Sequence, residues 1–156
     1  MKGNPIKYRA GYKYQLAERV TVQLEGINLP SDIDTEFIVL TKDGLLTIKR
    51  NYAWDGCSGP TWDDKTNMRG GLFHDALYQL MRMGLLPQEY KAVADTLLKE
   101  LIDDDSKTLL DDGTVIGAFK YKLNLMRAWY YYEGVDHFAA FAAKCGSDPY
   151  PIQIAP

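Results

Sequence analysis

The feature that most constrains this chain is a change of hydrophobic period near residue 52. Before it, "RVTVQLE" (19–25) and "TEFIVL" (35–40) are rich in β-branched residues and partly alternate between apolar and polar. After it, "GGLFHDALYQLM" (70–81) repeats apolar residues at helical spacing. Because strands come first and helices follow, the order predicts an α+β fold. We expect a small N-terminal antiparallel sheet followed by a bundle of three or four helices.

A length of 156 residues favours a single domain over residues 1–156. Apolar residues make up 46% of the chain and charged residues 25%, which is typical of a soluble globular protein. The expected parts are a β-rich part (1–52), a loop rich in Gly, Pro, Ser and Asp (53–67), a helical part (68–146) and an extended tail (147–156).

Turn and helix signals divide these parts further. Asp43–Gly44 between two β-prone runs predicts a hairpin within 41–50, and "YKYQLAE" (12–18) is a further strand. The first expected helix runs from about Asn67 to Met83 and is ended by Gly84, and the second runs from Pro87 to about Asp103, where "DDDSK" breaks it. A third helix is expected over 116–134 and a short fourth helix over 135–146. "LLDDGTV" (109–115) predicts a turn, with room for a short hairpin. The stripe Phe119, Leu123, Met126 and Trp129 is expected in the core, and the run Asp103–Asp105 is expected to be a solvated helix end.

Charge and composition exclude several classes of partner. The net charge is −3 and no basic face is concentrated in the sequence, so nucleic acid is not expected. No apolar run approaches the roughly 18–20 residues that span a bilayer. The N-terminus is polar and aromatic, unlike a signal peptide, and two cysteines are too few for a disulfide framework. These features predict a chain that works inside a cell or is released by lysis.

His74 lies on the predicted helix behind Gly70 and Gly71. Side chains on a helix lean toward its N-terminus, so the imidazole projects over the turn that holds these glycines. Each glycine costs roughly 0.5–1 kcal/mol relative to alanine within a helix. We therefore expect another segment or a ligand to come close at this point, with cleared space beside His74.

Asp75 points about a quarter turn away from His74, toward the preceding loop. That loop holds Trp54, Asp55, Gly56, Cys57, Ser58 and Gly59. Glycines at 56 and 59 permit backbone carbonyls to converge on one cation, and a carboxylate with several carbonyls is typical of calcium binding. Zinc fits poorly, because the two His and two Cys are scattered.

Asp95, in "AVADTLLKEL", lies at the edge of the apolar face of the second helix. The short Gly84–Pro87 connection makes the two helices antiparallel neighbours. Asp95 can then accept a hydrogen bond from His74, which fixes the tautomer and leaves the other ring nitrogen to deprotonate water.

The segments "YAWDGCSGP", "GGLFHDALYQL" and "AVADTLLKEL", followed by an aromatic helix, resemble a domain family of unknown function common in bacteriophage and prophage genomes. The likeness covers residues from about 35 to 134. It implies a phage origin, with action in the cytoplasm of an infected bacterial host or in the virion, and implies no particular activity.

The Gly-rich loop, the HD-x-x-Y motif and the later Asp are also similar, more distantly, to calcium-dependent phospholipase A2, especially the disulfide-free type of parvovirus capsids. The resemblance implies that His74 is the base, Asp75 a calcium ligand, Asp95 the orienter of His74 and Tyr78 a support of the network. Carbonyls near Gly56, Ser58 and Gly59 would complete the calcium site. The chain departs from this family in its glycine pattern, its extra Asp55 and its N-terminal β region.

Two function classes stay open. One is a hydrolase acting on a lipid or another ester, which requires His74 to be open to a pocket. The other is a non-enzymatic phage accessory protein, either a virion or tail component or a binder that blocks a host defence factor, in which the same residues form a buried structural network. A Cys57–His74 thiol–imidazole pair is a minor alternative, and His137 is expected to be a surface or packed histidine.

Overall fold

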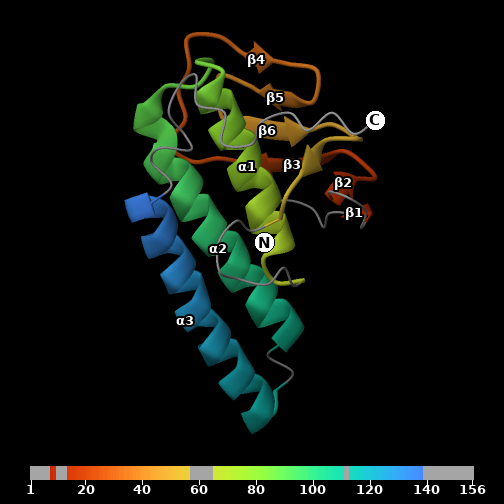
Figure 1. Cartoon of the computed structure of the whole chain (residues 1–156), viewed down its shortest axis with the longest axis vertical. Helices are drawn as coiled ribbons and strands as arrows, with labels where there is room; N and C mark the ends of the chain where they lie inside the picture. The colour runs from red at the N-terminus through yellow and green to blue at the C-terminus, as the bar shows by residue number, and fades with distance from the viewer. Residues whose placement is uncertain (1–7, 10–13, 57–64, 111–112, 139–156) are drawn as a thin grey trace, which may run out of the picture.

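The computed structural model describes residues 8–9, 14–56, 65–110 and 113–138. Its strands are β1 (Tyr8–Arg9), β2 (Tyr14–Leu16), β3 (Val20–Gln23), β4 (Ile33–Asp34), β5 (Ile38–Leu40), β6 (Leu45–Ile48) and β7 (Ala53–Trp54). Its helices are α1 (Met68–Arg82), a 3-10 turn η1 (Gln88–Tyr90), α2 (Lys91–Leu110) and α3 (Val115–Phe138). Strands precede helices, so the chain has the predicted α+β fold (Figure 1).

The strands form two antiparallel sheets where a single sheet was predicted. One has the order β3-β6-β5-β4 and the other the order β1-β2-β7. The second sheet exists because the chain returns after β6: Asn51 and Tyr52 exchange backbone hydrogen bonds with Leu16 at 2.8 Å. β7 lies inside the segment that was predicted to be only a loop, so that prediction is wrong for residues 53 and 54.

Alternation along the larger sheet directs its apolar side chains to one face. Val20 and Val22 of β3 are buried, as are alternate residues of β5 and β6. These side chains share one hydrophobic cluster with α1 and the first turns of α2. The predicted hairpin joins β5 to β6, and Gly44 has φ +88° there, in the left-handed region. A side chain at Gly44 would also meet the Leu24 carbonyl oxygen at 2.6 Å.

The described residues contain three α-helices, of which α2 and α3 extend beyond their predicted ends. α1 matches its predicted bounds within one residue, and Gly84 follows it with φ +70°. α2 continues through "DDDSK" to Leu110, so the predicted break there is wrong. α3 runs through Gly134 to Phe138, and there is no helix boundary at 135; one glycine costs only about 1 kcal/mol in a helix. Residues 139–146 of the predicted fourth helix and the tail lie outside the described residues.

The acidic run is inside α2 and is not a solvated helix end. Arg69 of α1 is buried, and its guanidinium contacts Asp104 at 2.8 Å and Asp105 at 2.7 Å. Asp103 accepts a hydrogen bond from Tyr121 of α3 at 2.8 Å. The sequence prediction failed here because the partners of these carboxylates come from two other helices.

α3 packs on α2 through its polar and small side chains. Gly117 and Asn124 are buried, and the Asn124 amide donates to Thr66 Oγ1 at 3.0 Å and to Ser106 Oγ. The stripe that was predicted to be core faces outward: Phe119, Leu123 and Met126 are exposed, as is Trp129. No helix among the described residues is long and apolar enough to cross a membrane.

Candidate functional site

Asp95 is the centre of a buried polar cluster between α1 and α2. Its Oδ1 atom lies 3.0 Å from His74 Nε2 and accepts a hydrogen bond from the Tyr78 hydroxyl at 2.7 Å. Its Oδ2 atom accepts a hydrogen bond from Lys91 Nζ at 2.6 Å. The predicted approach of His74 and Asp95 is therefore present, and the carboxylate has three donors.

Helical spacing and the antiparallel crossing bring these groups together. His74 and Tyr78 are four residues apart on α1, so they share one face, with ring centroids 4.0 Å apart. Lys91 and Asp95 have the same spacing on α2, at the end joined to α1 by η1. Sequence reasoning missed Lys91, although its spacing of four residues from Asp95 is a signal for an ion pair.

The donors around Asp95 define the tautomer of His74. An ionised carboxylate only accepts hydrogen bonds, so Nε2 of a neutral His74 must carry the hydrogen. The lone pair then lies on Nδ1, and this atom is 4.0 Å from Asp75 Oδ1. That separation is too long for a direct hydrogen bond and has room for one bridging water.

The pKa values of His74 and Asp95 are shifted in opposite directions by their surroundings. Burial opposes the charged imidazole, but the Asp75 and Asp95 carboxylates outweigh it and raise the pKa of His74. For Asp95, burial acts against ionisation, and the hydrogen bonds from His74, Lys91 and Tyr78 outweigh it and lower its pKa. The cluster therefore favours an ionised Asp95 held by donors.

Asp75 is the more accessible carboxylate, with 28% of its side chain exposed. Its pKa is raised, chiefly because burial disfavours the charge, with His74 and Arg82 acting against the shift and Asp55 adding to it. Asp55 comes directly after β7, in the segment toward which Asp75 was predicted to point. A cation beside these two carboxylates would relieve the cost of the charge on Asp75.

Only the two ends of the predicted loop, 53–56 and 65–67, are described. Trp54 is buried in β7, where its ring lies 5.6 Å from that of Tyr14. Gly56 is buried and has φ +79°, a conformation that favours glycine. Cys57, Ser58 and Gly59 lie outside the described residues, as do the proposed carbonyl ligands at 58 and 59. In the described ranges, no group of three or more His, Cys, Asp or Glu side chains is placed to hold a metal ion.

The two glycines of α1 were expected to clear space beside the imidazole. At Gly70 the space is taken by α2, because an added Cβ would lie 3.0 Å from Leu98 Cδ1 and 3.1 Å from the Leu98 carbonyl oxygen. Gly70 therefore permits the close crossing of α1 and α2, which confirms that another segment comes close here, whereas the cleared space expected beside the imidazole is filled at this glycine.

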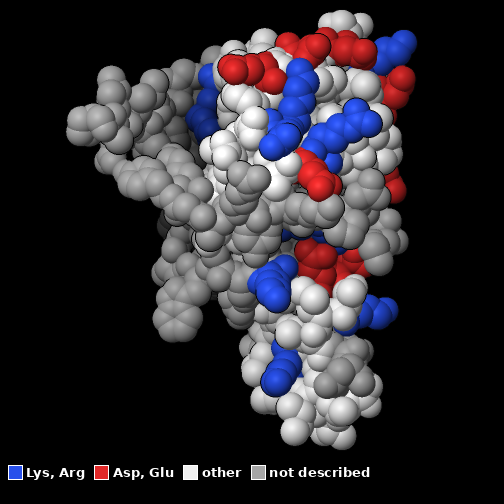
Figure 2. Space-filling view, turned by 90° about the vertical axis from the view of Figure 1, so that its right-hand side faces the viewer, with Lys and Arg blue, Asp and Glu red and all other residues white. Residues whose placement is uncertain are grey.

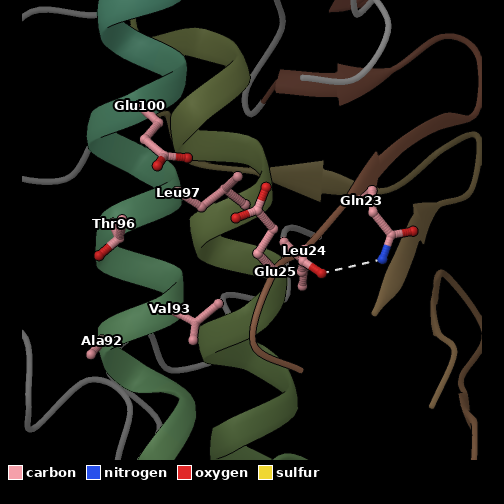
Figure 3. Close-up of a pocket in the computed structure, with 8 residues that line it drawn as sticks. All are labelled: Gln23, Leu24, Glu25, Ala92, Val93, Thr96, Leu97 and Glu100. Atoms are coloured by element: carbon pink, nitrogen blue, oxygen red, sulfur yellow. Dashed lines mark hydrogen bonds between the residues drawn. The ribbon is translucent and has the colours of Figure 1, made fainter. Parts of the chain in front are cut away.

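His74 and Asp95 are less exposed than an open pocket requires. His74 is 7% exposed and Asp95 is 1% exposed. A cavity of about 270 Å³ lies elsewhere, between the end of β3 and the opposite side of α2 (Figure 3). It is lined by Gln23, Leu24, Glu25, Ala92, Val93, Thr96, Leu97 and Glu100. No sequence signal indicated this cavity, because its walls come from segments about 70 residues apart.

Comparison with known proteins gives no match: no family model, no curated protein and no solved structure is significantly similar to the chain. The functional argument therefore depends on the geometry of the site.

Proposed function

We propose that this chain is a phage-encoded, calcium-dependent hydrolase that acts on an ester, with a phospholipid as the candidate substrate. The observation that carries the proposal is the orientation of His74. Asp95 holds Nε2, and Nδ1 faces the partly exposed carboxylate of Asp75 across 4.0 Å. The arrangement of His74, Asp75, Tyr78 and Asp95 agrees with the roles that the distant resemblance to phospholipase A2 implies.

The chemistry of the proposal needs one water between His74 and Asp75. Nδ1 takes a proton from this water, and the hydroxide forms a bond to the ester carbonyl carbon. The protonated imidazole, stabilised by Asp95, then gives its proton to the departing alkoxide as the ester bond breaks. Asp75 would hold the calcium ion, which would supply positive charge to the oxyanion. Tyr78 and Lys91 position Asp95 and do not touch the substrate.

Burial of His74, at 7% exposure, weighs against the hydrolase and in favour of the accessory protein, because a hydrolase requires an imidazole open to a pocket. A general base needs only one nitrogen within reach of the water. The side chain of His74 keeps 9% of its surface exposed, and that of Asp75 keeps 28%. Substrate would therefore approach from the Asp75 side.

The alternative proposal is a non-enzymatic phage accessory protein, in which the cluster specifies the fold. The observation that favours it is the burial of Asp95 together with its ion pair to Lys91 at 2.6 Å. A buried charge with three donors stabilises the α1–α2 crossing without any catalytic role. Such a protein would act as a virion or tail component, or bind a host defence factor.

The experiment compares hydrolysis of a phospholipid and of a short-chain ester by the wild-type chain, with calcium and with a chelator. The hydrolase proposal predicts calcium-dependent activity that His74→Gln abolishes and Asp75→Asn lowers at least a hundredfold. It also predicts that calcium raises the thermal unfolding midpoint of the wild type but not of Asp75→Asn. The matched control is Asp34→Asn, on an exposed strand far from His74 along the chain.

Asp75→Asn separates the two proposals because Asp75 makes no direct hydrogen bond in the cluster. A structural cluster predicts that this variant stays folded, that calcium changes neither midpoint and that neither ester is cleaved. That combination would rule out the hydrolase and leave the accessory protein.

A further inference from the structure

The exposed face of α3 is apolar over several turns. At about 100° per residue, Ile116, Phe119, Leu123 and Met126 fall within an arc of about 80°. Their exposed fractions lie between 48% and 69%. Single exposed apolar residues are ordinary, but a continuous stripe of large ones marks a surface that meets something other than water. We call these four residues the α3 stripe.

Basic residues flank the stripe on both sides. On the same helical projection, Lys122 lies about 40° outside one edge and Lys120 about 40° outside the other. Both lysines are exposed. The sequence of α3 from 115 to 129 has three basic residues and no acidic one, although the whole chain has a net charge of −3. In Figure 2 the lower end of the molecule shows basic and uncharged side chains, with the acidic ones gathered higher up.

We propose that the α3 stripe binds the surface of an anionic membrane. A helix with an apolar face flanked by lysines lies in the plane of the headgroups, where the apolar side chains enter the acyl boundary and the lysines meet lipid phosphates. α3 is placed for this, because it packs on α2 at the outside of the molecule, away from the sheets (Figure 1). Its buried side, with Gly117 and Asn124, faces α2 and leaves the stripe outward.

Charge argues against a second copy of the chain as the occupant. A two-fold contact between two α3 stripes would bring Lys120 and Lys122 of one copy close to the same residues of the other, with no acidic residue between 115 and 129 to pair with them. An anionic headgroup layer complements the same residues. Binding of the α3 stripe to a membrane does not depend on hydrolysis, since the partners of Asp95 described above, His74, Tyr78 and Lys91, all come from α1 and α2.

The test is co-sedimentation of the full chain with vesicles, in the presence of a chelator so that calcium-dependent hydrolysis is absent. Wild type is expected to bind vesicles of phosphatidylcholine with phosphatidylglycerol at least tenfold more tightly than vesicles of phosphatidylcholine alone. Phe119→Glu with Met126→Glu is expected to lower binding to the anionic vesicles at least tenfold. Lys120→Glu with Lys122→Glu is expected to remove the preference for anionic lipid.

The matched control is Met83→Glu with Leu85→Glu, two exposed apolar residues in the connection after α1. It is expected to bind like wild type, and thermal unfolding of each variant shows that it is folded. A wild type that binds neither vesicle overturns the proposal, as does a stripe variant that binds like wild type. A concentration-dependent dimer that the stripe variant converts to monomer, without vesicle binding, assigns the stripe to a second copy. His74→Gln is expected to bind vesicles like wild type, so failure of the hydrolase proposal and failure of the membrane proposal give different results.

Discussion

At the scale of single residues, the cluster around Asp95 shows how little of a site one motif contains. The pair His74–Asp75 is visible in the sequence, and helical spacing places Tyr78 beside it. The role of Asp95 followed only from assuming an antiparallel neighbour, and the structure has the hydrogen bond that this assumption required. Lys91 was missed, yet its ammonium is the closest donor to the carboxylate, at 2.6 Å.

Tyr78→Phe tests the strength of the network without removing ring packing. The substitution removes one donor to an ionised, buried carboxylate, and hydrogen bonds to charged groups contribute about 1.5–3 kcal/mol. We expect the free energy of unfolding, measured by urea denaturation, to fall by about 2 kcal/mol.

Tyr90→Phe is the matched control for that measurement. The Tyr90 hydroxyl donates to the neutral Asn28 carbonyl oxygen at 2.9 Å in an exposed contact. Its loss should cost about 0.5–1 kcal/mol. Equal losses in the two variants would show that Asp95 draws no special stabilisation from Tyr78.

At the scale of elements, the crossing of α1 and α2 depends on Gly70, which has no side chain. Apolar spacing predicted α1 almost to the residue, because Gly84 and the periodicity are local signals. The same sequence gave no means of telling whether Gly70 makes room for a ligand or for a helix. In the structure the neighbour is the Leu98 carbonyl of α2, so the glycine is explained by packing.

Gly70→Ala should therefore destabilise the protein even though alanine favours helices. The helix gains about 0.5–1 kcal/mol, while forcing a methyl group against the Leu98 backbone costs typically 1–3 kcal/mol. We expect a net loss of about 1 kcal/mol in the free energy of unfolding. Thr96→Ala, at an exposed position of α2, serves as the control and should be neutral or slightly stabilising. A Gly70→Ala variant more stable than wild type would contradict the close crossing.

At the scale of the whole molecule, the three helices are joined by polar contacts as well as by the core. Arg69 connects α1 to the acidic run of α2, and Tyr121 and Asn124 connect α2 to α3. The apolar side chains of α3 that look like core in the sequence face outward instead. Hydrogen bonds thus join the outer helix to the rest of the molecule, and the α3 stripe is exposed.

The pH dependence of stability should report the burial of Asp105. Burial, together with the nearby Asp104, outweighs Arg69 and raises the pKa of Asp105 from 3.8 to about 6. The folded state therefore binds the Asp105 proton more tightly than the unfolded state, and this contribution to stability is lost as pH rises from about 4 through 6. At about 1.4 kcal/mol per unit of pKa, the full change is on the order of 3 kcal/mol.

Asp105→Asn isolates this effect from other titrating groups. Asparagine resembles the protonated carboxyl, so the difference in unfolding free energy, variant minus wild type, should rise by up to about 3 kcal/mol between pH 4 and pH 7. Urea denaturation at both pH values measures it. A difference that stays constant with pH would refute the raised pKa.

The sequence by itself determined the order of strands and helices, the hairpin at Gly44 and the bounds of α1. These depend on periodicity and on turn residues, whose effects act within a few positions of the chain. Only the tertiary structure decided that Asp103–Asp105 lie inside a helix, that Gly70 faces a backbone, that His74 is buried and that the α3 stripe is exposed. Each of these depends on which partner another element brings to a residue, and local spacing carries no information about that partner.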